Sequence, residues 1–175
     1  PNVGFANTNA TRELPASPTT IASRDPLAMS AVGKADLGNI DISTDGATLY
    51  VMNLFDKSIY PVNTATGAVG SPIAVPAPAC VNGSWRPFAL EVNRGIVYAG
   101  GVCDASGAGG VTTNLTMQIY PYDPVAGTWG AGLFSGVGAS LDYDGVAGND
   151  DRDCAYSTTH GCQWNQWDDT WNPTD

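Results

Sequence analysis

Basic residues are scarce in this sequence. Lys and Arg together number 7 against 17 Asp and Glu, so the formal net charge is −10 at pH 7. Binding to a polyanion is driven by basic side chains that displace its counterions, so this composition excludes nucleic acid as a partner. Small cations are the partners that the charge balance favours.

Long hydrophobic runs and strong helix formers are also missing. No apolar run approaches the roughly 20 residues that span a bilayer, so the sequence predicts no membrane insertion. Charged residues reach only 14% of the 175 positions, whereas Gly numbers 21 and Pro 12. Such a composition favours many short strands joined by turns, within a chain long enough for one domain.

The cysteines point to an oxidising compartment. Their number, 4, is even, and they occur in an acidic chain with few lysines. The sequence begins at Pro1 and shows no charged segment followed by an apolar run, so we expect that any secretion signal has been removed. The predicted location is therefore extracellular, either secreted or attached to the cell surface.

A pattern of strands and turns occurs twice. ISTDGATLY at Ile42–Tyr50 matches LEVNRGIVY at Leu90–Tyr98, and SIYPVNTATGAV at Ser58–Val69 matches QIYPYDPVAGTW at Gln118–Trp129. The shift is 48 positions for the first pair (42 to 90) and 60 for the second (58 to 118). The second copy therefore carries about twelve extra residues, which lie in the glycine-rich segment VCDASGAGGVTT.

Each copy predicts four antiparallel strands, because apolar and polar residues alternate between turn signals. In the first copy the strands are expected at Asn39–Ser43, Thr48–Asn53, Ser58–Asn63 and Ala68–Ala74. Four such strands make one propeller blade, which must stack on its neighbours because it cannot bury both faces alone. A β-sandwich also fits the turn spacing, but it does not predict duplication of a four-stranded unit.

The segments ISTDGATLYVMN and IYPVNTATGAV together resemble the repeat of YVTN-type β-propellers. With CVNGSWRPFALEVNRGIVYAGGVC, they resemble the propeller of large secreted bacterial cell-surface proteins, which often carry adhesin-like modules. The resemblance covers about Leu37 to Phe134. It implies an all-β fold built from four-stranded antiparallel blades, but it specifies function poorly.

The chain is too short for a closed propeller, which needs at least four blades of roughly 40 to 50 residues each. We expect a section of a propeller, completed by the same longer polypeptide or by another chain, with a small open stack of sheets as the alternative. The predicted parts are an N-terminal segment or end of a preceding blade (1–38), a blade (39–79), a blade with a long inserted loop (80–139), and the acidic, Cys- and Trp-rich start of a further blade (140–175).

The cysteines are expected to form two disulfides. Cys80 and Cys103 flank a strand pair whose ends can lie close at one rim of a blade, and the resemblance supports their pairing. Cys154 and Cys162 enclose a short loop that a second bridge would close. The alternative is a metal site formed by these two and His160, but zinc normally has four Cys or His ligands at closer paired spacing.

The densest negative charge lies in DYDGVAGNDDRD. Its five aspartates are Asp142, Asp144, Asp150, Asp151 and Asp153. Carboxylates on a glycine-containing loop suit Ca²⁺, the one cofactor that the sequence suggests, although the spacing fits an EF-hand poorly. The alternative is a solvated acidic loop, with Arg152 neutralising part of its charge.

Aromatic residues form a second candidate binding site. Trp164, Trp167 and Trp171 stand at spacings of three and four, which would suit either a platform for a sugar or packing over the end of a blade. Trp85 and Arg86 begin a predicted strand, and by analogy with other propellers Arg86 would lie near the central channel.

The expected function is non-enzymatic: an extracellular module of a bacterial surface or filament-associated protein, acting in adhesion, scaffolding or assembly. Its partners would be the rest of the propeller and a protein or glycan at the cell surface. The chain has 1 histidine and lacks Gly-x-Ser-x-Gly, so a catalytic triad finds little support. Two alternatives stay open: a lactonase-like propeller hydrolase or lyase with an active site completed by residues missing from this chain, and a carbohydrate-binding module.

Overall fold

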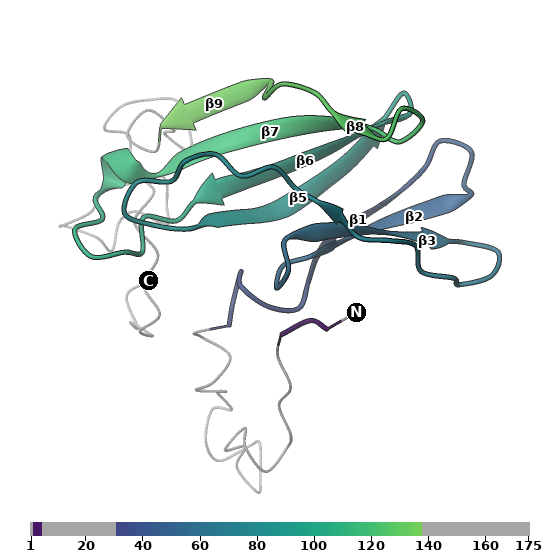
Figure 1. Ribbon diagram of the computed structural model, residues 1–175, viewed down its shortest axis with the longest axis horizontal. Coiled ribbons are helices and arrows are strands. Elements are labelled where there is room, and N and C mark those ends of the chain that lie inside the picture. The colour runs from purple at the N-terminus through teal and green to yellow at the C-terminus, as the bar shows by residue number, and fades with distance from the viewer. Residues whose placement is uncertain (1, 5–30, 138–175) are drawn as a thin grey trace, which may run out of the picture.

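The computed structural model describes residues 2–4 and 31–137, which form two antiparallel β-sheets (Figure 1). The first sheet contains, in spatial order, β1 (Leu37–Ile42), β2 (Thr48–Asn53), β3 (Ser58–Asn63) and β4 (Ile73–Ala74). The second contains β5 (Trp85–Asn93), β6 (Ile96–Cys103), β7 (Thr116–Asp123) and β8 (Thr128–Trp129), and β9 (Phe134–Val137) also pairs with β7. A 3-10 turn, η1 (Thr112–Asn114), precedes β7. No helix in these ranges is long and apolar enough to cross a membrane.

The predicted all-β fold is confirmed, and so are the bounds of β2 and β3. The fourth predicted strand is largely replaced by a single bridge between Val62 and Val69, followed by the two-residue β4. Gly70 donates its N–H to the Pro61 carbonyl at 2.8 Å, and Pro72 has no N–H to donate. The outer strand is therefore interrupted, and the second sheet repeats the interruption between β8 and β9, where Gly130 donates to Pro121 at 2.8 Å.

The sequence repeat is also a repeat of strand register. The β2–β3 pairs Tyr50 with Pro61 and Val51 with Tyr60 recur 48 and 60 positions later as β6–β7 pairs. The following turns match as well: Asn63 Oδ1 accepts N–H groups from residues 65 and 66, and Asp123 Oδ1 accepts them from 125 and 126. The two sheets are thus two copies of one unit.

The ungapped alignment of the first hairpins is wrong by two residues. Asp41 pairs with Tyr50, whereas Glu91 pairs with Tyr98, so Asp41 and Glu91 are the equivalent positions. The cause is a difference in turn length. The β1–β2 turn is the longer one, and it is closed by a hydrogen bond from the Ser43 N–H to the Thr48 carbonyl (2.8 Å). The β5–β6 turn consists only of Arg94 and Gly95. These two residues have φ values of 52° and 80°, as a tight two-residue hairpin turn requires.

The two sheets pack face to face around one core. The buried core cluster comprises Tyr50, Met52, Leu54, Ile59, Val75, Leu90, Val97, Ala99 and Tyr122. The first sheet contributes Tyr50, Met52 and Ile59 from β2 and β3, and the second contributes residues of β5, β6 and β7.

The first strands of the two sheets meet side by side and run parallel. Asn39 Nδ2 donates to the Leu90 carbonyl at 2.7 Å, and Asp41 Oδ2 accepts the Val92 N–H at 2.6 Å. Both pairs are 51 positions apart, which is the constant offset that parallel strands require. Asp41 Oδ1 also accepts the N–H of Ile42 at 2.8 Å, so one carboxylate joins edge N–H groups of both sheets.

The two faces of each sheet carry different residues. Residues paired directly across antiparallel strands share a face, which allows each face to be assigned from the register. We call one the Tyr-Pro face: Asp41, Tyr50, Met52, Ile59 and Pro61 in the first sheet, and Glu91, Tyr98, Gly100, Ile119 and Pro121 in the second. We call the other the Val face: Ile40, Ile42, Leu49, Val51, Val62 and Val69 in the first sheet, and Leu90, Val92, Val97, Ala99, Tyr122 and Trp129 in the second.

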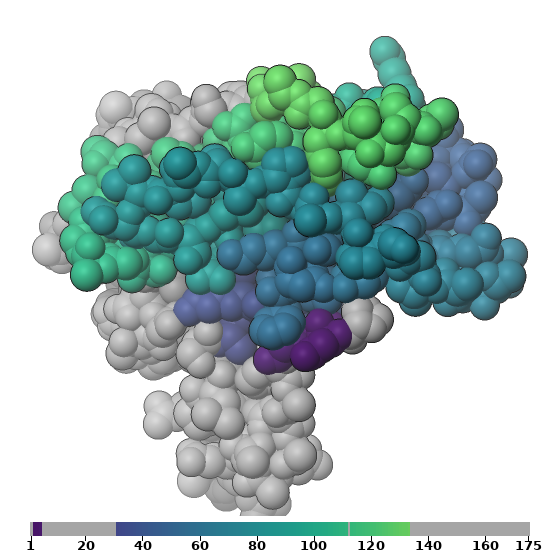
Figure 2. Space-filling model, in the orientation of Figure 1, coloured from purple at the N-terminus to yellow at the C-terminus, as the bar shows by residue number. Residues whose placement is uncertain are grey.

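The sheets stack head to tail. The core joins the Tyr-Pro face of the first sheet to the Val face of the second. The Val face of the first sheet and the Tyr-Pro face of the second lie outside this core cluster. Residues 2–4 lie against the first sheet without forming a strand. The Val3 carbonyl accepts the N–H of Asp36, just before β1 (2.7 Å), and the Asn2 carbonyl accepts the side-chain amide of Asn53 (3.0 Å); Figure 2 shows these residues in purple against blue atoms of that sheet.

Candidate functional site

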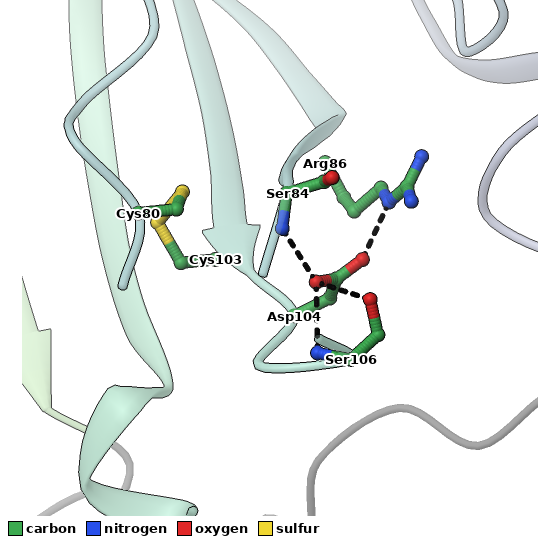
Figure 3. Close-up of a disulfide and its surroundings, with 6 residues drawn as sticks. All are labelled: Cys80, Ser84, Arg86, Cys103, Asp104 and Ser106. Carbon is green, nitrogen blue, oxygen red and sulfur yellow. Dashed lines mark hydrogen bonds and ion pairs between the residues drawn. A yellow bond between two sulfur atoms is a disulfide. The ribbon is translucent and has the colours of Figure 1, made fainter. Parts of the chain in front are cut away.

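A disulfide and a polar cluster mark the end of β6, where the inserted loop begins (Figure 3). Cys80 and Cys103 are bonded, with Cα atoms 5.4 Å apart, as predicted. Cys103 is fully buried. The bridge ties the segment that precedes β5 to the C-terminal end of β6, and it thereby fixes the root of the loop.

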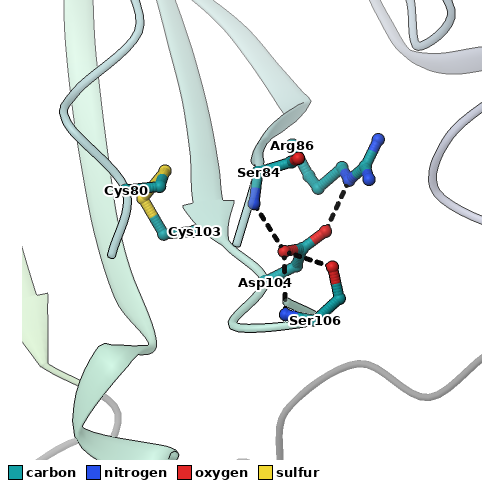
Figure 4. Close-up of polar contacts among 6 residues, drawn as sticks. All are labelled: Cys80, Ser84, Arg86, Cys103, Asp104 and Ser106. Atoms are coloured by element: carbon teal, nitrogen blue, oxygen red, sulfur yellow. Dashed lines mark hydrogen bonds and ion pairs between the residues drawn. A yellow bond between two sulfur atoms is a disulfide. The ribbon is translucent and has the colours of Figure 1, made fainter. Parts of the chain in front are cut away.

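Asp104 is the centre of the polar cluster (Figure 4). Only 3% of its side chain is exposed. Its Oδ1 accepts the Ser84 N–H at 2.7 Å and the Ser106 N–H and Oγ at 3.1 and 2.9 Å. Its Oδ2 pairs with Arg86 Nε at 2.7 Å. All of these partners lie on the loop root or at the start of β5, so one carboxylate holds both together.

The hydrogen bonds decide the charge state of this carboxylate. Burial alone would raise the pKa of Asp104, but the Ser84 N–H, the Arg86 guanidinium and the N–H and Oγ of Ser106 lower it to about 2. A buried charge with several donors and a cationic partner is stable, whereas the same charge without them is costly. Asp104 is therefore ionised at neutral pH and acts as a structural anchor.

A second cation comes from the first sheet. Lys57 lies half-buried in the β2–β3 turn with a φ of 58°. Burial lowers the pKa of Lys57, the nearby Arg86 charge lowers it further, and the Asp104 charge opposes both. The charge of Lys57, in the first sheet, is therefore close enough to those of Arg86 and Asp104, in the second, to interact with them.

The inserted loop has a defined conformation of its own. Asn82 accepts the Gly107 N–H at its carbonyl (2.8 Å) and donates Nδ2 to the Gly109 carbonyl (3.0 Å). At the far end of the loop, Asn114 Oδ1 accepts the Val111 N–H at 3.2 Å. These hydrogen bonds hold the loop in one conformation. The side chains of Val81, next to Asn82, and of Val111, which bonds Asn114, are exposed.

The other predicted site residues lie outside the described ranges: Cys154, Cys162, Asp142, Asp144, Asp150, Asp151, Asp153, Trp164, Trp167 and Trp171. Across residues 2–4 and 31–137, no group of three or more His, Cys, Asp and Glu side chains could hold a metal ion. Arg86 lies in β5 as expected, where it pairs with Asp104.

Sequence reasoning missed Asp104, Lys57 and the bridging role of Asp41. A signal for Asp104 was present, because it directly follows a cysteine that begins the insertion and Arg86 stands on the opposite side of the predicted hairpin. Lys57 and Asp41 offered no comparable signal, since their contacts depend on how two sheets pack.

No protein-family model matches the chain, and a search of curated proteins finds no match.

Proposed function

We propose that the two sheets are adjacent blades of an extracellular β-propeller in a bacterial surface or filament-associated protein, acting in adhesion, scaffolding or assembly without catalysis. The observation that carries this proposal is the head-to-tail stacking of two copies of one four-stranded unit. The rest of the ring would come from the same longer polypeptide or from another chain.

Head-to-tail stacking favours a ring over a sandwich for a geometric reason. Contacts between unlike faces leave one matching face free at each end, so such contacts generate rings or open arrays. The strands that join the two sheets, β1 and β5, run parallel to each other at one side of the stack. The innermost strands of neighbouring propeller blades are arranged in the same way. A sandwich of two equivalent sheets related by a two-fold axis would instead bring like faces together and leave no matching face free.

The loop after β6 is the proposed contact surface for a partner protein. It is held by the Cys80–Cys103 disulfide and the Asp104 cluster, so binding would cost little conformational entropy. Exposed Val81 and Val111 provide apolar contacts near its anchors. The disulfide and the acidic composition agree with an extracellular setting.

The proposal is tested by the architecture and the location of the complete polypeptide. Electron cryomicroscopy should show four-stranded sheets arranged around an axis, and antibodies against this chain should label intact cells. The proposal would be contradicted if the sheets were not arranged around a common axis, or if the antibodies labelled cells only after lysis.

Partner binding has a matched control. Purified chain carrying Val81→Asp and Val111→Asp should bind intact cells at least tenfold more weakly than wild type, because charge would replace the apolar contacts. Val125→Asp, at a residue that is 96% exposed in the β7–β8 turn, should bind normally. An equal loss of cell binding in both variants would show that the loop is not part of the binding surface.

A further inference from the structure

The Val face of the first sheet has the composition of a buried interface but is only partly covered: Leu49, Val51 and Val62 are half-buried, and Ile40, Ile42 and Val69 are exposed. Its Ile42 and Val69 side chains are 46% and 51% exposed, whereas the equivalent residues of the second sheet, Val92 and Trp129, pack against the core. Ile40 is likewise exposed, and its equivalent Leu90 is only 2% exposed. The same positions are thus covered in one sheet and uncovered in the other.

The surface that fits this face is present on the same chain. In the internal interface, the Val face of the second sheet receives the Tyr-Pro face of the first. The second sheet has its own Tyr-Pro face, with half-buried Tyr98, Ile119 and Pro121, and this face lies outside the core cluster. One chain therefore carries both halves of a second interface of the same kind.

The strand edges of the two sheets also correspond in position. Asp41 bonds the Val92 N–H across the internal interface. Glu91 is the equivalent of Asp41 and is exposed, and Ile42 is the equivalent of Val92. The Ile42 N–H is already bonded to Asp41 Oδ1, so the match at this edge is one of position and not of a free hydrogen-bond donor.

We infer that the Val face of the first sheet is a docking surface for the second sheet of another copy of this chain, which binds through its Tyr-Pro face. The inference rests on the head-to-tail stacking that also supports the proposed propeller. Because the faces are unlike, association is heterologous, and each copy keeps one free face of each kind until a ring closes.

Sedimentation equilibrium of the purified chain tests this inference. The average mass should rise above that of one chain as the concentration increases, and Ile42→Lys with Val69→Lys should weaken association at least tenfold. Both side chains are exposed, so the substitutions should leave the fold intact, which circular dichroism checks. Val125→Lys is the matched control and should associate like wild type.

Mixing two variants separates unlike-face from like-face association. The Ile42→Lys, Val69→Lys chain and a Glu91→Lys, Tyr98→Lys chain should each be monomeric, yet together they should form a one-to-one dimer through their intact faces. If Tyr98→Lys unfolds the chain, Glu91→Lys alone serves, because Glu91 is exposed. A wild-type chain that stays monomeric, or a mixture that does not associate, would overturn the inference.

These outcomes are distinguishable from failure of the proposed function. A monomeric chain together with a radial arrangement of sheets in the complete polypeptide would overturn self-association and leave the propeller standing. Head-to-tail association without radial sheets would support the docking surface and contradict the propeller.

Discussion

Asp104 shows how one residue holds two elements together. Its carboxylate bonds the start of β5, the loop root and the Arg86 guanidinium, while almost none of it is exposed. A buried ionised group of this kind is stabilising only while all its partners remain. The residue therefore allows two predictions, one from substitution and one from pH.

Asp104→Asn should destabilise the protein by about 2–4 kcal/mol, because the amide leaves Arg86 without its charge partner and cannot accept every hydrogen bond. Urea unfolding followed by fluorescence measures the change. Asp123→Asn is the matched control, since the equivalent residue in the first sheet is Asn63 and forms the same turn. The control should change the free energy of unfolding by less than about 0.5 kcal/mol; similar losses in both would contradict the role of Asp104.

Acid should remove the same stabilisation. The pKa of Asp104 is lowered from 3.8 to about 2, so its contribution is fully present above pH 3.8 and is lost as the pH falls towards 2. The loss amounts to about 2 kcal/mol at about 1.4 kcal/mol per pKa unit. Unfolding curves of wild type and Asp104→Asn should therefore converge between pH 4 and 2. Curves that stay parallel through this range would rule out a depressed pKa.

At the scale of elements, turns decided what could be predicted from the sequence. The alternating residues of β2 and β3, followed by matching Asx turns, allowed correct strand bounds and the correct repeat. The outer strand was predicted too long because a Gly and a Pro interrupt it. The first hairpins were misaligned because ungapped letters cannot reveal a difference in turn length.

The disulfide is the element-scale feature that the resemblance supported correctly, whereas the Asp104 cluster beside it was missed. The bridge closes a loop with a sequence separation of 23 residues. Replacing both Cys80 and Cys103 with Ala should cost about 3 kcal/mol, mainly because the unfolded chain gains freedom. Thermal unfolding of wild type and variant under the same non-reducing conditions measures this. An unchanged melting temperature would show that the bridge does not stabilise the protein.

Gly38 permits the close approach of β1 to β5. A Cβ at this position would lie 2.9 Å from the Phe88 carbonyl oxygen and 2.8 Å from Leu54 Cδ2. Gly38→Ala should therefore separate the two sheets and cost about 1–3 kcal/mol, the usual cost of overpacking. Gly100→Ala, where the nearest atom would be the Ala89 Cβ at 3.3 Å, should cost less. The reverse order in chemical denaturation would contradict the close junction.

At the scale of the whole molecule, the sequence predicted two equivalent units but not which faces meet. Both faces of each sheet carry apolar residues, so periodicity alone could not distinguish a symmetric pair of layers from head-to-tail stacking. The distinction depends on the β1–β5 contacts, where Asn39 and Asp41 bond backbone groups of the next sheet. Those contacts arise from packing between segments about 50 residues apart.

Nuclear Overhauser effects between methyl and aromatic protons test the head-to-tail packing most directly. Head-to-tail packing predicts cross-peaks that join Met52 and Tyr50 of the first sheet to Val97 and Tyr122 of the second. Cross-peaks from Met52 and Tyr50 to Tyr98 and Ile119 instead would show that like faces meet, and they would contradict both the stacking and the propeller proposed from it.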